Sequence, residues 1–316
     1  ACCATWWWTC CAGLPCKPDA AGPAVRHKKA TDAARCGDTA PMTEPTAPRT
    51  APEPAPAAAA LTAPSSVNPD VDPLFLAAPR VSTFLGQHAL TNASGFFFER
   101  DDRLFLVTSR HVVIDEASEH LPDRLEIELH TDARNLTLST GFSMLLYAKG
   151  KAVWRQGRDS GGDIDVAVIE LDRRALPPSA IVRAFTPAHL PPAFDSVPAD
   201  AALCIVGFPL GFHDVVHHLP VLRSAAVASP FGIRFQGQGY FLTDARTHRG
   251  TSGAAVVMRD PAPSAATAAL PWRLLGVHSA RMDMGNRDLV LDESLGLNCA
   301  WYADILLTLT GPAKAA

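Results

Sequence analysis

Short apolar runs, each bounded by turn-forming residues, recur along the chain from Val81 onward. The runs are four to eight residues long, which is the usual length of a β-strand and too short for most helices. Strands at this density, with few long helical patterns between them, predict an all-β fold built as a barrel or a sandwich. The runs cover residues 95–98, 104–107, 125–129, 135–138, 166–171, 203–206, 221–228, 239–242, 254–258 and 274–277.

Three further segments differ from these runs. Residues 99–102, Glu-Arg-Asp-Asp, join two runs and predict a hairpin turn. Residues 177–198 are rich in proline and are typical of a crossover between two lobes. Residues 300–309 are the best helix candidate, and we expect that helix to close the chain against the second lobe.

The first 78 residues read as a leader rich in cysteine, alanine and proline, and we expect it to be disordered. Seven prolines lie between Pro41 and Pro64, where they remove hydrogen-bond donors and block helix formation. Six of the eight cysteines fall in the first 36 residues without CxxC spacing, so an unstructured tail is favoured over a metal site. No signal peptide is evident, which favours the cytoplasm.

Charge and cysteine content exclude several classes of partner. A net charge of −4 and a pI near 6.3 argue against nucleic acid, since such domains usually carry a basic footprint. No run approaches the roughly 18 uninterrupted apolar residues that a membrane-spanning helix needs. Only Cys204 and Cys299 lie in the part that reads as folded, and we expect free thiols there rather than a disulfide.

A histidine, an aspartate and a serine stand in this chain order at strand ends and in a tight turn. His111 follows an apolar run, Asp165 opens Val-Ala-Val-Ile, and Ser252 lies in Gly250-Thr-Ser-Gly. A serine hydroxyl needs a base to take its proton, and the base needs an anion to orient it. The three residues therefore predict a catalytic triad, with the amides of Gly250 and Ser252 forming an oxyanion hole. Asp163 is the local alternative to Asp165.

These segments resemble the chymotrypsin-like (trypsin-fold) serine peptidases, particularly bacterial trypsin-like and glutamyl endopeptidases. The likeness covers residues 81–309 and rests on Val107-Thr-Ser-Arg-His111, Asp165-Val-Ala-Val and Gly250-Thr-Ser-Gly253. It implies two antiparallel six-stranded barrels, at about 79–185 and 196–300, with the cleft between them and a closing helix at 300–309. The whole peptidase domain would span 79–313. It also implies a polypeptide substrate, cleaved by a serine endopeptidase without a metal or organic cofactor.

The same resemblance extends to the pocket that would hold the residue before the cut bond. Thr247 and His278 resemble the Thr and His pair of glutamyl endopeptidases, Ser279 follows His278, and Arg246 adds a positive charge. A hydroxyl and an imidazole can both donate hydrogen bonds to a carboxylate, and hydrogen bonds to a charged group are stronger than those between neutral groups. We therefore expect cleavage after acidic residues, with the alternative that His278 only packs behind the pocket.

Two other interpretations stay open at this point. A trypsin-like fold can bind peptides without cutting them, so a non-catalytic peptide-binding module is the alternative function. An esterase of the α/β-hydrolase kind is disfavoured, since its serine would precede the aspartate and histidine. His213, His217 and His218 could together hold zinc, but solvated loop histidines are favoured because the segment reads as a loop.

Overall fold

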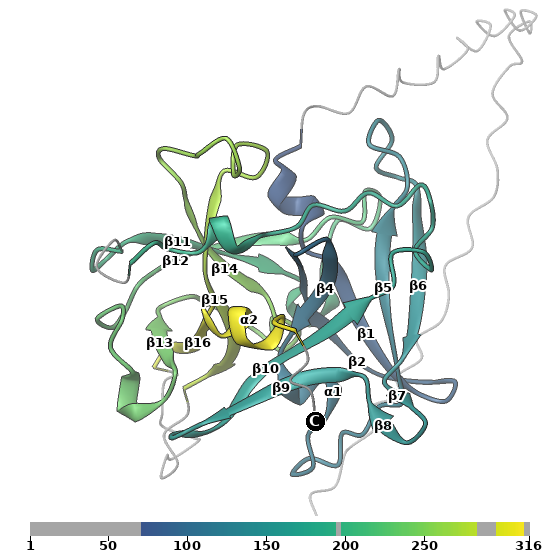
Figure 1. Cartoon of the computed structure of the whole chain (residues 1–316), viewed down its shortest axis with the longest axis horizontal. Helices are drawn as coiled ribbons and strands as arrows, with labels where there is room; N and C mark the ends of the chain where they lie inside the picture. The colour runs from purple at the N-terminus through teal and green to yellow at the C-terminus, as the bar shows by residue number, and fades with distance from the viewer. Residues whose placement is uncertain (1–70, 194–196, 283–294, 313–316) are drawn as a thin grey trace, which may run out of the picture. The chain divides into compact units, whose positions relative to one another are not determined.

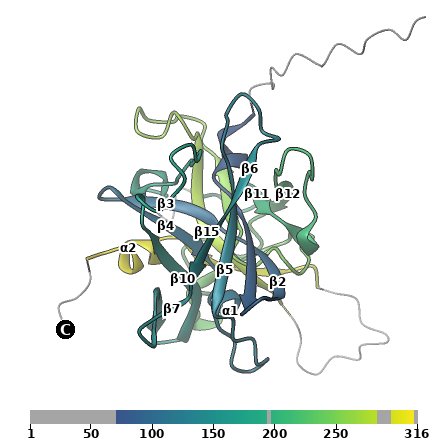
Figure 2. The ribbon, with the colours of Figure 1, turned by 90° about the vertical axis from the view of Figure 1, so that its right-hand side faces the viewer.

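The computed structural model describes residues 71–193, 197–282 and 295–312. These residues form antiparallel β-sheets in two lobes, seen in Figure 1 and, after a quarter turn, in Figure 2. The prediction of an all-β, trypsin-like fold is confirmed. The expected leader at 1–78 lies, except for its last eight residues, outside the described residues.

The first lobe is built of two antiparallel sheets and not of one continuous six-stranded sheet. Its elements are β1 (Arg80–Leu85), β2 (His88–Ser94), β3 (Phe96–Arg100), β4 (Arg103–Thr108), α1 (Arg110–Val113), β5 (Arg124–His130), β6 (Ser139–Leu145), β7 (Tyr147–Ala148), β8 (Lys151–Ala152), β9 (Trp154–Asp159) and β10 (Gly162–Leu171). They form two four-stranded sheets, in the orders β2-β1-β5-β6 and β3-β4-β10-β9. The small β7–β8 hairpin separates β6 from β9.

Gly95 is the corner at which one strand passes from the first sheet to the second, as β2 and then β3. A Cβ at this position would lie 2.9 Å from the Val107 carbonyl oxygen and 3.0 Å from the Leu106 side chain. Only glycine allows so close an approach of the two backbones. The predicted hairpin turn is present between β3 and β4. Asp101 and Asp102 have φ angles of 51° and 61°, as a two-residue type I′ turn requires.

The second lobe is a single six-stranded antiparallel sheet in the order β12-β11-β14-β15-β16-β13. Its elements are β11 (Ala202–Gly207), β12 (Val221–Ala226), β13 (Tyr240–Thr243), β14 (Ala255–Arg259), β15 (Trp272–Arg281) and β16 (Asn298–Tyr302), followed by α2 (Ile305–Leu309). A bridge between Val227 and Thr243 links the two ends of this order, so the sheet curls towards a closed barrel.

Three buried apolar clusters hold the described residues together. One fills the first lobe and another the second. The third joins the lobes: it contains Phe96 and Phe105 of the first lobe, Val277 of the second, and Leu306 of α2. In Figure 1 α2 accordingly lies in front of the junction of the two lobes. No helix among the described residues is long and apolar enough to cross a bilayer.

Two sequence predictions were wrong at the level of single elements. Residues 300–302, predicted as the start of the helix at 300–309, are the end of strand β16, because β16 pairs with β13 and β15, and α2 begins only at Ile305. Residues 135–138 form a turn before β6, since the Asn135 side chain accepts a hydrogen bond from the Thr137 amide.

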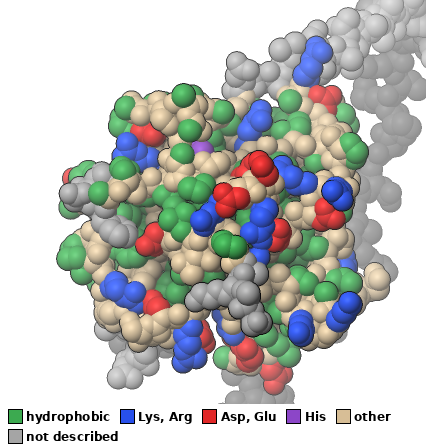
Figure 3. Space-filling model, in the orientation of Figure 1, with side chains coloured by type: hydrophobic (Ala, Val, Ile, Leu, Met, Phe, Trp, Pro, Cys, Tyr) green, Lys and Arg blue, Asp and Glu red, His purple; other side chains and the backbone are tan. Residues whose placement is uncertain are grey.

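Cys204 and Cys299 are both free. On the face drawn in Figure 3, acidic and basic side chains are interspersed and form no large patch of one sign.

Candidate active site

His111 lies in the short helix α1, directly after the end of β4. Its backbone N–H donates to Asp165 Oδ1 at 2.8 Å, and its ring Nδ1 lies 2.7 Å from Asp165 Oδ2. One carboxylate therefore holds both the main chain and the ring of the histidine. The imidazole remains accessible, with 37% of its side chain exposed.

Asp165 occupies a disturbed part of strand β10. The pairing of β10 with β9 shifts register between Asp163 and Ala167, and this irregularity turns Asp165 towards His111. Its Oδ2 also accepts a hydrogen bond from the Ser279 hydroxyl at 2.5 Å. Asp163 instead forms an ion pair with Arg158 and is half-exposed, so the structure brings Asp165, and not Asp163, to the histidine.

Ser252, in the second lobe, continues the hydrogen bonding that begins with Asp165 and His111 in the first lobe. Its Oγ lies 2.8 Å from His111 Nε2 and 3.2 Å from the Ser279 carbonyl oxygen. With the Asp165 carboxylate accepting from Nδ1–H, the remaining ring nitrogen Nε2 carries the lone pair and can accept the serine proton. Gly253 permits this turn: its φ is +82°, and a Cβ there would press on Thr108 and Ser94.

Hydrogen bonds to two backbone carbonyls orient the amide groups of Gly250 and Ser252. The Arg249 carbonyl accepts from Leu210 N–H at 2.5 Å, and the Thr251 carbonyl accepts from Ala254 N–H at 3.0 Å. Because C=O and N–H point in opposite directions across a trans peptide, these bonds turn the N–H groups of Gly250 and Ser252 the other way. Neither N–H has a hydrogen-bond acceptor among the described residues.

Ser94 ties the first lobe to this nucleophile loop. Its hydroxyl donates to the Gly250 carbonyl at 2.8 Å and accepts from Phe208 N–H at 2.9 Å. Its own N–H donates to the Ser252 carbonyl at 3.0 Å. Ser94 is fully buried, so these bonds are shielded from water and hold the loop firmly.

The pKa of His111 lies above its usual value. Burial alone would lower it, but the hydrogen bond and the negative charge of Asp165 outweigh burial, and the charge of Asp115 adds to them. A raised pKa means that the imidazole is a stronger base than free histidine and better able to accept a proton.

The residues predicted for substrate recognition lie in different environments. His278 is buried on β15, and burial first, then the nearby His111, lower its pKa to about 4, so it is neutral at physiological pH. Thr247 is also buried, and its hydroxyl donates to Asn298 Oδ1 at 2.5 Å. Arg246 is exposed to solvent. The Ser279 hydroxyl is bonded to Asp165 and so positions the carboxylate.

Sequence reasoning missed Asn298, Arg249 and Ser94. The Asn298 amide donates to the Ala245 carbonyl at 2.6 Å and thereby fixes the oxygen that binds Thr247. Arg249 lines an open groove of about 570 Å³ together with His111 and Ser252. An asparagine, an arginine or a serine in a loop has no sequence signature of its own, and only the Ser-Gly step before the 96–98 run could have drawn attention to Ser94.

Residues 93–261 match the family model of the trypsin-like peptidase domain. No curated protein matches the chain. A serine endoprotease of Yersinia pestis is similar in structure, with 16% identity and a TM-score of 0.42, over 75% of this chain and 62% of that one. The active form of the Rv3671c protease of M. tuberculosis is also similar in structure, with 15% identity and a TM-score of 0.41, over 78% of this chain and 87% of that one.

The chain spans less than two thirds of the Yersinia enzyme. The family match covers just over half of the chain, and the chain belongs to the trypsin-like peptidase domain family.

Proposed function

We propose that the chain is a serine endopeptidase in which Ser252 is the nucleophile, His111 the general base and Asp165 the anion that orients His111. The observation that carries the proposal is the unbroken line of hydrogen bonds from Asp165 through His111 to Ser252, at 2.7 and 2.8 Å. Free serine is unreactive at neutral pH, and this arrangement is what makes it nucleophilic.

The proposed reaction proceeds in two steps through an acyl-enzyme. Ser252 Oγ attacks the carbonyl carbon of the peptide bond while His111 Nε2 takes the hydroxyl proton. The negative charge that develops on the substrate oxygen is stabilised by the N–H groups of Gly250 and Ser252. His111 then gives its proton to the leaving amine, and the acyl group stays on Ser252. Water, deprotonated by His111, attacks the acyl carbon, and the proton returns to Ser252 as the acid leaves.

Peptide cleavage by the purified full chain tests this function. We expect mass-spectrometric profiling of a peptide library to find cleavage by the wild type and by Ser179→Ala, and none by Ser252→Ala. Ser179 is an exposed serine in the crossover between the lobes, which makes it a matched control. Equal cleavage by all three proteins would contradict the proposal, and no cleavage by any of them would favour a module that binds peptides without cutting them.

The proposed preference for an acidic residue before the cut bond rests on His278. Because Thr247 already donates its proton to Asn298, the imidazole of His278 is the group left to donate to a carboxylate. A hydrogen bond to a charged group contributes about 1.5–3 kcal/mol, which corresponds to a preference of roughly 10- to 100-fold. Arg246 is exposed and adds at most a screened, long-range attraction.

Matched peptides that differ only before the cut bond measure this preference. We expect kcat/KM for the Glu peptide to exceed that for the isosteric Gln peptide about 10-fold or more, and His278→Asn to reduce the ratio towards one. The Arg and Phe peptides should be slower still. Equal or faster turnover of the Arg or Phe peptide would reject the acidic preference and leave the peptidase function intact.

The acid side of the pH profile reports on His111. As base, His111 must be neutral, so kcat/KM should fall as pH drops through its raised pKa. Asp115→Asn removes a negative charge that raises this pKa, and we expect the fall to move to lower pH. Glu116→Gln is the control, because this neighbouring carboxylate is exposed and paired with Arg110. A shift to higher pH in Asp115→Asn would contradict this electrostatic account.

A further inference from the structure

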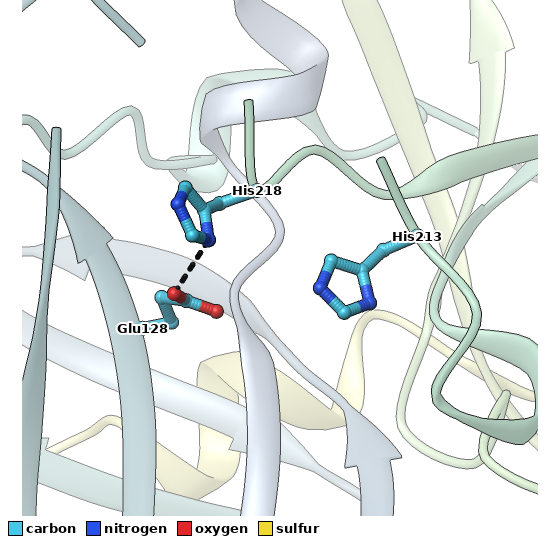
Figure 4. A group of neighbouring side chains, drawn as sticks. All are labelled: Glu128, His213 and His218. Atoms are coloured by element: carbon cyan, nitrogen blue, oxygen red, sulfur yellow. Dashed lines mark ion pairs between the residues drawn. The ribbon is translucent and has the colours of Figure 1, made fainter. Parts of the chain in front are cut away.

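Glu128, His213 and His218 form a cluster between strand β5 of the first lobe and the loop before β12 of the second (Figure 4). One ligand atom of each residue lies within 4.8 Å of the other two. Sequence analysis favoured solvated loop histidines here because the segment reads as a loop, and it did not consider Glu128, which is far away in the chain. In the structure all three residues are partly buried.

We propose that this cluster is a binding site for a Zn²⁺ ion. Two imidazole nitrogens and one carboxylate oxygen are a donor set that zinc takes in proteins, with a water as the fourth ligand. Calcium and magnesium prefer sets made only of oxygen atoms. Tetrahedral zinc with bonds of about 2.0–2.2 Å holds its ligand atoms roughly 3.3 Å apart, so the side chains must adjust their spacing on binding.

The loop fold brings the two histidines together. Asp214 and Leu219 form an antiparallel bridge, with Asp214 N–H donating to the Leu219 carbonyl at 3.0 Å. Because the two strands of this bridge run in opposite directions, His213 lies just outside the loop that the bridge closes and His218 just inside it. The Asp214 carboxylate accepts from the amides of Val216 and His217 and so holds the inside of this loop. Such preformed geometry lowers the cost of arranging the ligands.

Hydrogen bonds also prepare the ligand atoms themselves. His213 Nδ1 lies 2.6 Å from the Gly211 carbonyl, so Nδ1 carries the proton and Nε2 carries the lone pair. Figure 4 shows the His213 ring presenting a nitrogen towards Glu128 and His218. Glu128 Oε1 lies 2.8 Å from His218 Nδ1 and accepts from the Ser139 hydroxyl at 3.0 Å. A metal ion replaces the proton shared by His218 and Glu128.

The charged groups around the cluster affect its affinity for zinc. Arg80 donates to the other oxygen of Glu128, Oε2, at 3.1 Å and partly neutralises it. His217 is paired with Asp214 through its Nδ1, the Nε2 of His130 lies 2.7 Å from the His217 carbonyl oxygen, and neither histidine belongs to the cluster. We therefore expect a site weaker than one built around an unpaired carboxylate.

A bound ion would connect the two lobes through protein ligands. Glu128 belongs to β5, whereas His213 and His218 belong to the segment that begins at η4 (Pro209–Gly211). We expect zinc to slow amide hydrogen exchange in both segments. At a free zinc concentration of about 100 times Kd, we expect the melting temperature to rise by roughly 5–10 °C.

Equilibrium dialysis of the untagged full chain tests the site. The six cysteines before residue 37 are themselves possible zinc ligands, so the thiols are first blocked with iodoacetamide. We expect one equivalent of Zn²⁺ to bind to the wild type and to His217→Ala, whose side chain faces Asp214. His213→Ala and Glu128→Gln should each lose that equivalent and the rise in melting temperature.

Two results would overturn the site: no bound zinc in the wild type, or the same stoichiometry in the wild type, His213→Ala and Glu128→Gln. Circular dichroism shows whether each variant is folded, and Glu128→Gln keeps the size and most hydrogen bonds of the native side chain. All these measurements can be made on Ser252→Ala, so the result does not depend on peptidase activity.

Discussion

Replacing Asp165 by asparagine should lower kcat about 10⁴-fold, with little change in KM. Asparagine keeps the size of the side chain but favours the wrong imidazole tautomer and cannot stabilise the charged ring. Both His111 N–H and Ser279 Oγ also bond to this carboxylate, so its charge is shared by three donors. The measurement is steady-state cleavage of the best peptide found by profiling.

Asp163→Asn is the matched control, because Asp163 is on the same strand two residues away and pairs with exposed Arg158. We expect its kcat to stay within about twofold of the wild type, as is usual for surface substitutions. Thermal unfolding of both variants separates lost chemistry from lost fold. If Asp163→Asn were the inactive variant, the assignment of the orienting carboxylate would be wrong.

Gly250→Ala should lower kcat about 10²- to 10³-fold. Gly250 has φ +88°, and a Cβ there would lie 2.6 Å from the Phe208 carbonyl oxygen and 2.9 Å from Leu210 N. Both are backbone atoms that cannot move aside, so the peptide that carries Gly250 N–H must turn. The loss of one oxyanion donor typically has this magnitude.

Gly150→Ala is the control for backbone strain. Gly150 has a similar φ of +74° in the β7–β8 hairpin, and a Cβ added there would have no neighbouring atom within 4 Å. The alanine at this position has the same conformational cost but meets no neighbour, so we expect normal turnover with slightly lower stability. Equal losses of kcat in the two variants would mean that strain, and not the oxyanion donor, explains the effect at Gly250.

The fold was predictable because its strands carry local signals. Apolar runs of strand length appear as β3, β4, β10, β11 and β14, and the turn residues between them mark the hairpins. The last three residues of β16, 300–302, were predicted as helix because Ala-Trp-Tyr shows no alternation, and the pairing of β16 with β13 and β15 comes from residues far away. Tertiary contacts decide such segments.

The candidate site could be predicted only in part, because contacts from distant parts of the chain also decide which residues form it. The side chains with distinctive chemistry, His111, Asp165 and Ser252, stand beside recognisable strand ends and glycines. The groups that position these side chains have no such signal in the sequence. Leu210 acts through a backbone N–H, and Asn298 acts through an amide buried between strands. The Glu128 cluster depends on a contact between the two lobes, which no local pattern reports.

Labelling with a fluorophosphonate tests most directly whether Ser252 is activated by His111. The reagent phosphonylates a serine only when a neighbouring base removes its proton, whatever the natural substrate is. We predict one adduct per wild-type chain, mapped by tandem mass spectrometry to the peptide containing Ser252, and none in His111→Ala. A wild-type chain that stays unlabelled, or an adduct that persists in His111→Ala, would contradict the account.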